Sequence, residues 1–492
     1  MAAATGQGGA ARSAVLARAP ELCRLGATEL AAAIRARNVS AREAMAAYLR
    51  HIEATNPAYN AIVSLRPREA LLAEAGAVDA RLGRGEALGT LCGLPMAIKD
   101  SVPTAGLRTT EGSPIFADFV PDADAPMVER IRRAGAIVIG KTNTPEFTLG
   151  SSTYNRVFGI TRNAWDSARQ AGGSSGGAAV ALALRMLPVA DGSDFGGSLR
   201  NPAAWNNVFG FRPSQGRVPS LPAEELFFAQ MSTPGPIARS VGDLALLLTV
   251  QAGYDARAPL SLGRAEIAFE EGLREGGIEG TRIAWLADLG GHLPMEPGIL
   301  ALCEGALGLL AGRGCAIEPA LPRFDFGRLW RAFVTLRCFA IGGRLGRLYD
   351  DPAKRAQMKP EARYEVEQFR RLSAAEVRAA SVVRSDWYLA LLALFARFDF
   401  LALPAGQMFP FPAETDWPRA VAGREMDSYH RWMEVMIGPT MSGCPTIAVP
   451  AGFGAGGLPM GLQLVGPPRK DHAVLRLAQA YEDVCPWAKE AP

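Results

Sequence analysis

Long apolar runs are missing from this sequence. A membrane-spanning helix needs about 20 consecutive apolar residues, and the nearest approach, residues 387–400, is interrupted by Arg397 and Asp399. Residues 1–20 are rich in alanine and glycine and lack the apolar core of a secretory signal. We therefore expect a cytoplasmic protein without membrane attachment, whose residues 1–20 form a flexible tail.

An excess of charge of one sign is missing as well. The 52 Lys and Arg residues nearly balance the 49 Asp and Glu residues, which leaves a formal net charge of +3. So weak a charge argues against a nucleic-acid partner and against an anionic membrane surface. The seven cysteines form no C-x-x-C pair and the four histidines form no H-E-x-x-H motif. We therefore expect reduced, mostly buried thiols, no disulfide framework, no metal and no cofactor.

Apolar periodicity predicts an α/β fold. Helical spacing runs through residues 27–52, where Ser40 followed by Glu43 is a capping-box pattern that separates two helices. The other helices are expected at residues 67–82, 124–134, 178–186, 240–252 and 471–483. Short buried strands are expected at residues 93–98, 136–140, 447–450 and 460–465. Strand alternating with helix predicts layers with parallel strand pairing.

Two segments rich in glycine and serine, residues 172–177 and 191–202, carry the candidate chemistry. A flexible loop is the ordinary interpretation of such composition, but these segments lie among strand and helix patterns. A phosphate site would need a G-K-[ST] or G-x-G-x-x-G motif, and neither occurs. Nucleophilic catalysis by a serine is the third interpretation. The G-x-S-x-G pattern of α/β-hydrolases fits Ser174 and Ser175 equally well, and His430 or His472 would then complete that site.

Several segments together resemble the amidase-signature family. They follow one another in the order of that family from the N-terminal helices to the C-terminal helix, with a gap at about residues 258–400. The matching segments are residues 93–100, 140–147, 161–166, 172–198, 210–213, 235–240, 443–445 and 457–463. The resemblance implies one α/β/α domain over residues 1–492, with a large mixed twisted sheet covered by helices and a variable substrate-side region at residues 258–432.

The resemblance also implies a Ser–Ser–Lys triad. Lys99 would be the base, Ser174 the bridging serine on a cis peptide bond after Gly173, and Ser198 the nucleophile. The implied oxyanion hole consists of the N–H groups of Phe195, Gly196, Gly197 and Ser198. The implied supporting residues are Ser175, Ser193, Asp194 and Arg200, the last two as a buried ion pair.

Elementary chemistry agrees with the role of Lys99. A lysine accepts a proton only when uncharged, and its unperturbed pKa is about 10.4. The apolar run before Lys99 places its amine near a buried strand end, where desolvation lowers the pKa. Taken alone, Lys99 could instead pair with the adjacent Asp100, and this alternative stays open.

The sequence thus predicts an amidase that hydrolyses carboxylic amides, with anilides, esters and carbamates as further candidates. Its partners would be a small amide substrate and water, and a homodimer is a candidate assembly. Four aromatic or apolar residues are candidates for a substrate pocket, because they lie close to Ser198 in the order of the matching segments: Phe195, Phe227, Phe228 and Met231. The alternatives are the glutaminase (A) subunit of a tRNA-dependent amidotransferase and a non-catalytic binding protein on the same fold.

Overall fold

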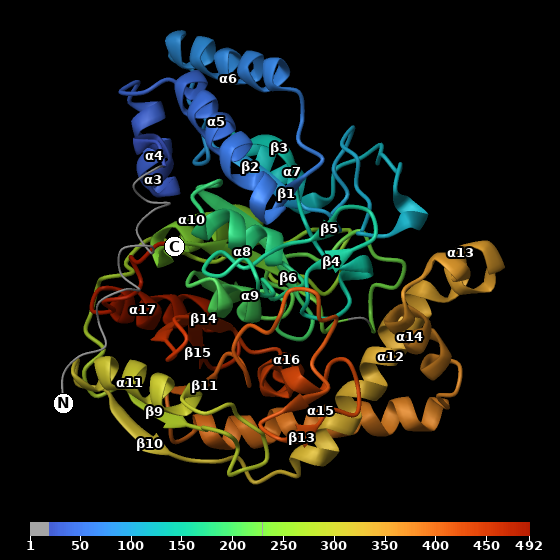
Figure 1. Cartoon of the computed structure of the whole chain (residues 1–492). Coiled ribbons are helices and arrows are strands. Elements are labelled where there is room, and N and C mark those ends of the chain that lie inside the picture. The colour runs from blue at the N-terminus through green and yellow to red at the C-terminus, as the bar shows by residue number, and fades with distance from the viewer. Residues whose placement is uncertain (1–18, 229) are drawn as a thin grey trace.

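The N-terminal part of the molecule consists mainly of helices. The computed structural model describes residues 19–228 and 230–492; apart from Ala19 and Pro20, the tail expected at residues 1–20 lies outside them. After α3 (Glu21–Arg24), three helices lie at one end of the molecule (Figure 1): α4 (Ala27–Arg35), α5 (Ala41–Tyr59) and α6 (Arg68–Gly83). Ser40 caps α5 by accepting from the Glu43 N–H at 3.1 Å, which confirms the predicted capping box.

A small sheet of three strands connects these helices to the rest. Its order is β1 (Ile62–Val63), β3 (Ile137–Thr142), β2 (Pro95–Lys99), and β2 pairs with β3 in parallel. Helix α7 (Pro126–Arg133) lies between β2 and β3 in the chain. The predicted buried strand, helix and strand are therefore confirmed, and β2 ends on Lys99.

A mixed sheet of eight strands forms the centre of the molecule. In spatial order its strands are β10 (Ala316–Pro319), β9 (Arg282–Trp285), β11 (Phe400–Pro404), β15 (Pro459–Val465), β14 (Thr446–Phe453), β7 (Phe209–Arg212), β8 (Thr233–Ala238) and β6 (Val189–Asp194). Only the pairs β10–β9 and β9–β11 are parallel. The prediction of an α/β fold with a large mixed sheet is confirmed.

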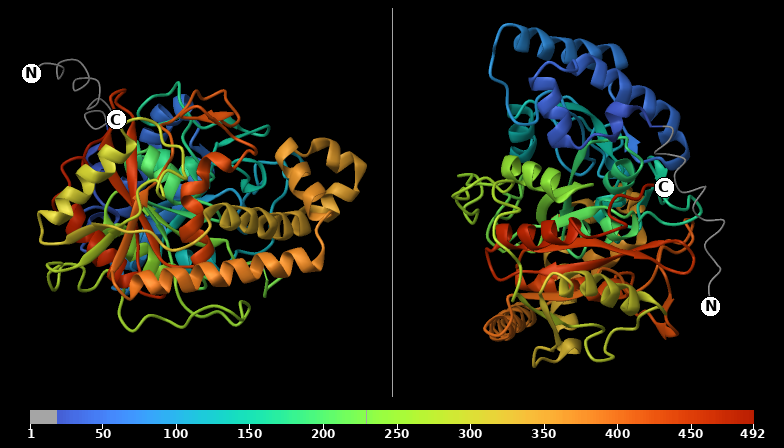
Figure 2. Two further views of the ribbon diagram at one scale, coloured as in Figure 1. Left: turned by 90° about the horizontal axis from the view of Figure 1, so that it is seen from below. Right: turned by 90° about the vertical axis from the view of Figure 1, so that its left-hand side faces the viewer.

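Helices cover this sheet (Figure 2). They are α8 (Gly176–Ala183), α9 (Arg200–Trp205), α10 (Val241–Gln251), α11 (Ile299–Ala311), α16 (Ile437–Ser442) and α17 (Asp471–Glu482). All eight residues of α8 are buried, which explains why its sequence is apolar on every side. Ser240 caps α10 as predicted, accepting from the Asp243 N–H at 3.2 Å.

The region 258–432 contains both helices and strands. Besides α11, its helices are α12 (Phe326–Asp350), α13 (Pro352–Gln357), α14 (Pro360–Phe369) and α15 (Ala374–Phe395), and these four extend to one side of the molecule (Figure 1). The same region supplies β9, β10 and β11 to the central sheet, which the apolar pattern did not predict.

The remaining short elements of the described chain are β4 (Tyr154–Asn155), β5 (Gly159–Ile160), β12 (Ala420–Val421), β13 (Arg424–Glu425) and the 3₁₀ turns η1 (Pro114–Phe116), η2 (Glu146–Thr148) and η3 (Arg431–Met436).

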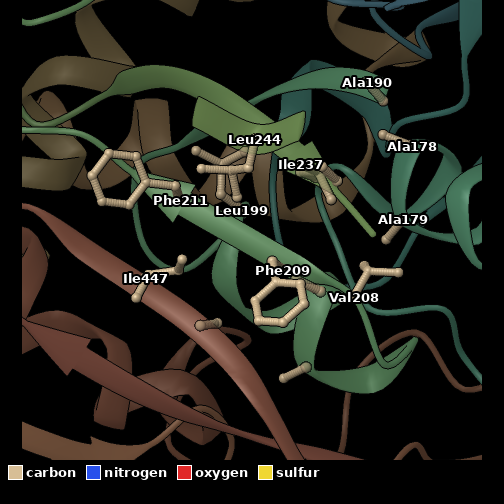
Figure 3. Close-up of a cluster of buried hydrophobic side chains, with 14 of the residues drawn as sticks. Ala178, Ala179, Ala190, Leu199, Val208, Phe209, Phe211, Ile237, Leu244 and Ile447 are labelled. Atoms are coloured by element: carbon tan, nitrogen blue, oxygen red, sulfur yellow. The ribbon is translucent and has the colours of Figure 1, made fainter. Parts of the chain in front are cut away.

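A large apolar core joins most of the helices to the central sheet, and a smaller separate cluster lies between α12 and α14. Figure 3 shows Phe209 and Phe211 on β7 among Leu199, Ile237 and Ile447, all fully buried. All seven cysteines are free and buried, as the sequence predicted. Among the residues that the structure describes, no helix is long and apolar enough to cross a membrane.

An aromatic stack centred on Trp205 ties α9 to the segment before α16. The Trp205 ring stacks on Trp432 with centroids 5.6 Å apart and meets the edge of Phe411 at 5.7 Å. Its Nε1–H donates to the Met408 carbonyl at 3.2 Å. Trp205 is fully buried, so it holds the helix that follows Ser198 against the core.

We therefore expect Trp205→Ala to lower the free energy of unfolding by about 3–5 kcal/mol, because it leaves a large cavity. Urea unfolding followed by circular dichroism measures the loss. Phe228→Ala is the matched control, since 75% of that side chain is already exposed. An equal loss in the two variants would contradict the assigned packing role.

Candidate active site

Lys99 places its amine among three hydroxyl groups. It is fully buried at the end of β2, and its Nζ lies 2.8 Å from Ser174 Oγ, 3.0 Å from Ser175 Oγ and 3.0 Å from Ser193 Oγ. Asp100, the alternative partner, turns away and accepts hydrogen bonds from the hydroxyl and N–H of Thr110. The amine is therefore surrounded by neutral hydroxyls.

Burial lowers the pKa of Lys99 to about 7, although the charges of Asp191 and Asp194 oppose the shift. Asp191, on β6, is the residue that the sequence interpretation missed here. Its two carboxylate oxygens accept from the Lys99 N–H at 3.1 and 3.3 Å, so it joins β2 to the edge strand of the central sheet. Desolvation raises the pKa of the Asp191 carboxyl. Its only local signal was an aspartate next to Gly192 in a segment rich in glycine and serine.

Ser174 and Ser175 stand where the chain enters α8. The Gly173–Ser174 peptide bond is cis, and the Ser174 carbonyl accepts from the Thr144 hydroxyl at 2.9 Å. The Ser175 N–H donates to the Ser198 carbonyl at 3.3 Å. A Cβ on Gly192 would lie 2.7 Å from Ser175 Oγ, so the glycine on β6 leaves room for this hydroxyl.

The segment after β6 carries Ser198. Gly197 has φ +110°, a conformation that side chains rarely adopt. Its N–H donates to Asp194 Oδ1 at 2.8 Å, so it is not a free oxyanion donor, contrary to the expectation. The N–H groups of Phe195, Gly196 and Ser198 have no hydrogen-bond partner in the described part of the chain. Three of the four implied donors are thus available.

A buried ion cluster holds this segment from behind. Arg200 Nε and Nη2 donate to the two carboxylate oxygens of Asp194 at 2.9 Å each, and both side chains have zero exposure. Arg212 is a second buried partner of Asp194, at 3.3 Å, to which the sequence interpretation gave no role. Burial alone would raise the pKa of Asp194, but Arg200 and Arg212 hold it well below its usual range.

A cavity of about 960 Å³ opens above these groups. Ser174, Ser193 and Ser198 line it together with Phe195. The other pocket predictions are wrong. Phe227 and Phe228 do not line the cavity and are 60% and 75% exposed, because their loop turns them to solvent. Met231 lies in the core beside β8.

Residues of α12 supply much of the opposite wall. They include Arg337, Phe339, Ile341 and Arg344. The sequence placed this helix in the substrate-side region but selected none of these side chains. Their helical spacing resembles that of an ordinary core helix, so no local signal distinguished them.

The four histidines, all within the described residues, bond to groups other than Ser174, Ser175 and Ser198. His51 bonds the Leu184 carbonyl, His292 bonds Glu434, His430 bonds Ser428 and His472 bonds the Glu271 carbonyl. The α/β-hydrolase interpretation, which needed His430 or His472 at the nucleophile, is therefore wrong.

Comparisons with known proteins identify the family of this chain. A family model described as Amidase matches residues 43–475. An acylamidase of Rhodococcus erythropolis is 35% identical over 472 residues, covering 95% of this chain and 97% of that protein. The A subunit of the glutamyl-tRNA(Gln) amidotransferase of Acidothermus cellulolyticus is 36% identical over 488 residues, covering 94% of each.

Solved structures have the same fold. A bacterial aryl acylamidase of the amidase-signature family superposes with a TM-score of 0.88 at 29% identity, covering 94% of this chain and 96% of that one. A 6-aminohexanoate cyclic dimer hydrolase complexed with its substrate superposes with a TM-score of 0.84 at 26% identity, covering 96% and 99%. The chain therefore belongs to the amidase family of amidase-signature enzymes, which are hydrolases acting on carbon–nitrogen bonds.

Proposed function

We propose that this protein hydrolyses acyl amides and anilides through Ser198, Ser174 and Lys99. The observation that carries the proposal is the Lys99 amine, buried and within 2.8 Å of Ser174 Oγ. An uncharged amine has two N–H bonds and one lone pair. It can donate to Ser175 and Ser193 while it accepts from Ser174, which matches its three hydroxyl neighbours. Substrate reaches the site through the cavity that Ser174 and Ser198 both line.

In the acylation step, Ser198 Oγ attacks the amide carbonyl carbon. Its proton passes to Ser174 Oγ, and the Ser174 proton passes to Lys99 Nζ. The oxyanion accepts from the free N–H groups of Phe195, Gly196 and Ser198. The C–N bond then breaks, and the proton returns from Lys99 through Ser174 to the leaving nitrogen.

In the deacylation step, water attacks the Ser198 ester and gives its proton to the same relay. The proton then returns to Ser198 Oγ, and the carboxylic acid is released. Asp194, locked to Arg200 and Arg212, keeps the Ser198 segment in place throughout. Acyl or aryl groups of the substrate would lie against the α12 residues that line the cavity, which makes the region 258–432 the substrate side.

The glutaminase component of a tRNA-dependent amidotransferase is the second candidate, because a protein of that kind is 36% identical to this chain. Glutamine would then be the amide, and its ammonia would pass to a partner protein. Release of ammonia from glutamine, together with co-purifying partners and no hydrolysis of anilides, would favour this candidate. The homodimer and the cytoplasmic location stay predictions.

We expect Ser198→Ala to lower kcat/KM on an anilide panel at least about a thousandfold, since it removes the attacking oxygen. A fluorophosphonate probe should label the wild-type protein at Ser198 and leave this variant unlabelled. Ser381→Ala, on the exposed face of α15, is the matched control. Hydrolysis by Ser198→Ala at the wild-type rate would refute the assignment.

We expect activity to depend on the protonation of Lys99. The base works only when uncharged, and burial lowers its pKa to about 7. Log kcat/KM should therefore rise with unit slope as the pH approaches about 7 from below, and level off above it. Steady-state rates from pH 5 to 9 measure this. A profile that is flat across that range would show that no such base limits the reaction.

A further inference from the structure

Arg337 is a charged side chain in the wall of the catalytic cavity. It lies in the middle of α12, is 6% exposed, and lines the cavity with Ser198 and Phe195. No step of the proposed reaction uses it. A buried guanidinium at such a place needs an explanation, because burying a charge without partners is costly.

Two of its three nitrogens are occupied by protein. Nε donates to Glu365 Oε1 at 2.8 Å, and Nη2 donates to the Tyr429 hydroxyl at 2.8 Å. Tyr429 in turn donates to the same Glu365 oxygen. Nη1 has no hydrogen-bond partner among the described residues, and it is not one of the fully buried atoms. Nη1 is therefore the part of the guanidinium that faces the cavity.

Aromatic rings fix the orientation of the guanidinium. Its Cζ lies 5.2 Å from the ring centre of Phe195 and 5.6 Å from that of Tyr429. Phe195 is also one of the residues whose N–H is free for an oxyanion. The Nη1 donor is thus held rigidly near the reaction centre, with little entropy to lose when a ligand binds.

The charge of Arg337 is already compensated. Glu365 is fully buried, and its carboxylate forms an ion pair with Arg337. A second carboxylate, on the substrate, would approach the negative charge of Glu365 as well as Arg337. Arg344, the next arginine of α12 on the cavity wall, is likewise paired, with Glu111 at 3.1 Å. A neutral oxygen suits the remaining donor better than an anion.

We propose that Arg337 determines specificity by donating an Nη1 hydrogen bond to a neutral carbonyl or ether oxygen of the substrate. The substrate would be an amide whose apolar acyl or aryl part carries one such additional acceptor, because the neighbouring wall residues Phe195, Phe339 and Phe369 are aromatic. This inference rests on the proposed amidase function and narrows its substrate class.

The test compares amides that differ only in the additional oxygen. The panel contains two kinds of pair. In the first, an anilide with a para-acetyl group is compared with the anilide that has a para-ethyl group. In the second, an anilide with a keto group in its acyl chain is compared with the anilide of the plain acyl chain of equal length. The wild type should favour the oxygen-bearing member of at least one pair. In Arg337→Met, the kcat/KM ratio of that pair should fall at least about tenfold, the usual effect of losing a hydrogen bond to a charged group. Arg331→Met, exposed on the same helix, should keep the wild-type ratio.

Glu365→Gln provides the second variant. It leaves the positive charge of Arg337 uncompensated, so the kcat/KM of a carboxylate-bearing anilide relative to its neutral keto analogue should rise about tenfold or more. Two results with the wild type alone would overturn the inference: no preference within any pair, or a preference for the carboxylate over the neutral oxygen. These results do not depend on whether the variants fold. An unchanged ratio in folded Arg337→Met would also overturn it while leaving the amidase function intact. Hydrolysis of no panel member would instead refute the proposed function.

Discussion

The candidate site depends on the exclusion of solvent from one amine, that of Lys99. Lys99 lies at the end of β2 with zero exposure, and within the described part of the chain the hydrogen-bond partners of its Nζ are all serine hydroxyls. Desolvation favours its uncharged form, which is the only form that can accept a proton. The carboxylates that might have restored the charge are engaged elsewhere. Asp191 accepts from the Lys99 backbone, and Asp194 pairs with Arg200 and Arg212.

The two sheets together bring the residues of the candidate site into contact. The small sheet delivers Lys99, and the edge strand β6 of the large sheet delivers Ser193 and leads to Ser198. Asp191 joins the two edges through a backbone hydrogen bond. Behind Ser198, the side chains of Asp194, Arg200 and Arg212 are fully buried, so the Coulomb attraction between them is stronger than at the surface and the loss of one partner would leave an uncompensated buried charge. A buried amine with a lowered pKa and a buried ion cluster, which are far apart in the sequence, thus lie close together in the fold.

Local patterns made part of this architecture predictable. The capping box at Ser40 and the apolar run that ends on Lys99 need only neighbouring residues, and the structure confirms both elements. Contacts between distant segments were beyond such patterns. The wall that Arg337 forms depends on Glu365 and Tyr429, which are 28 and 92 residues away. Phe227 and Phe228 were misplaced because the order of the matching segments does not tell which way the side chains of a loop turn. Gly197 was misassigned because its N–H binds a side chain, Asp194, whose position depends on tertiary structure.

The protonation of Lys99 can be measured directly on the resting protein. Uniform labelling of lysines with ¹³C at the ε position gives one NMR signal for each lysine, and its loss in Lys99→Arg identifies the signal of Lys99. We expect that signal to titrate with a midpoint at about 7, far below the value of about 10.4 for an exposed lysine. A midpoint near that of an exposed lysine would contradict the central claim, because the amine would then be charged at neutral pH and unable to act as the base.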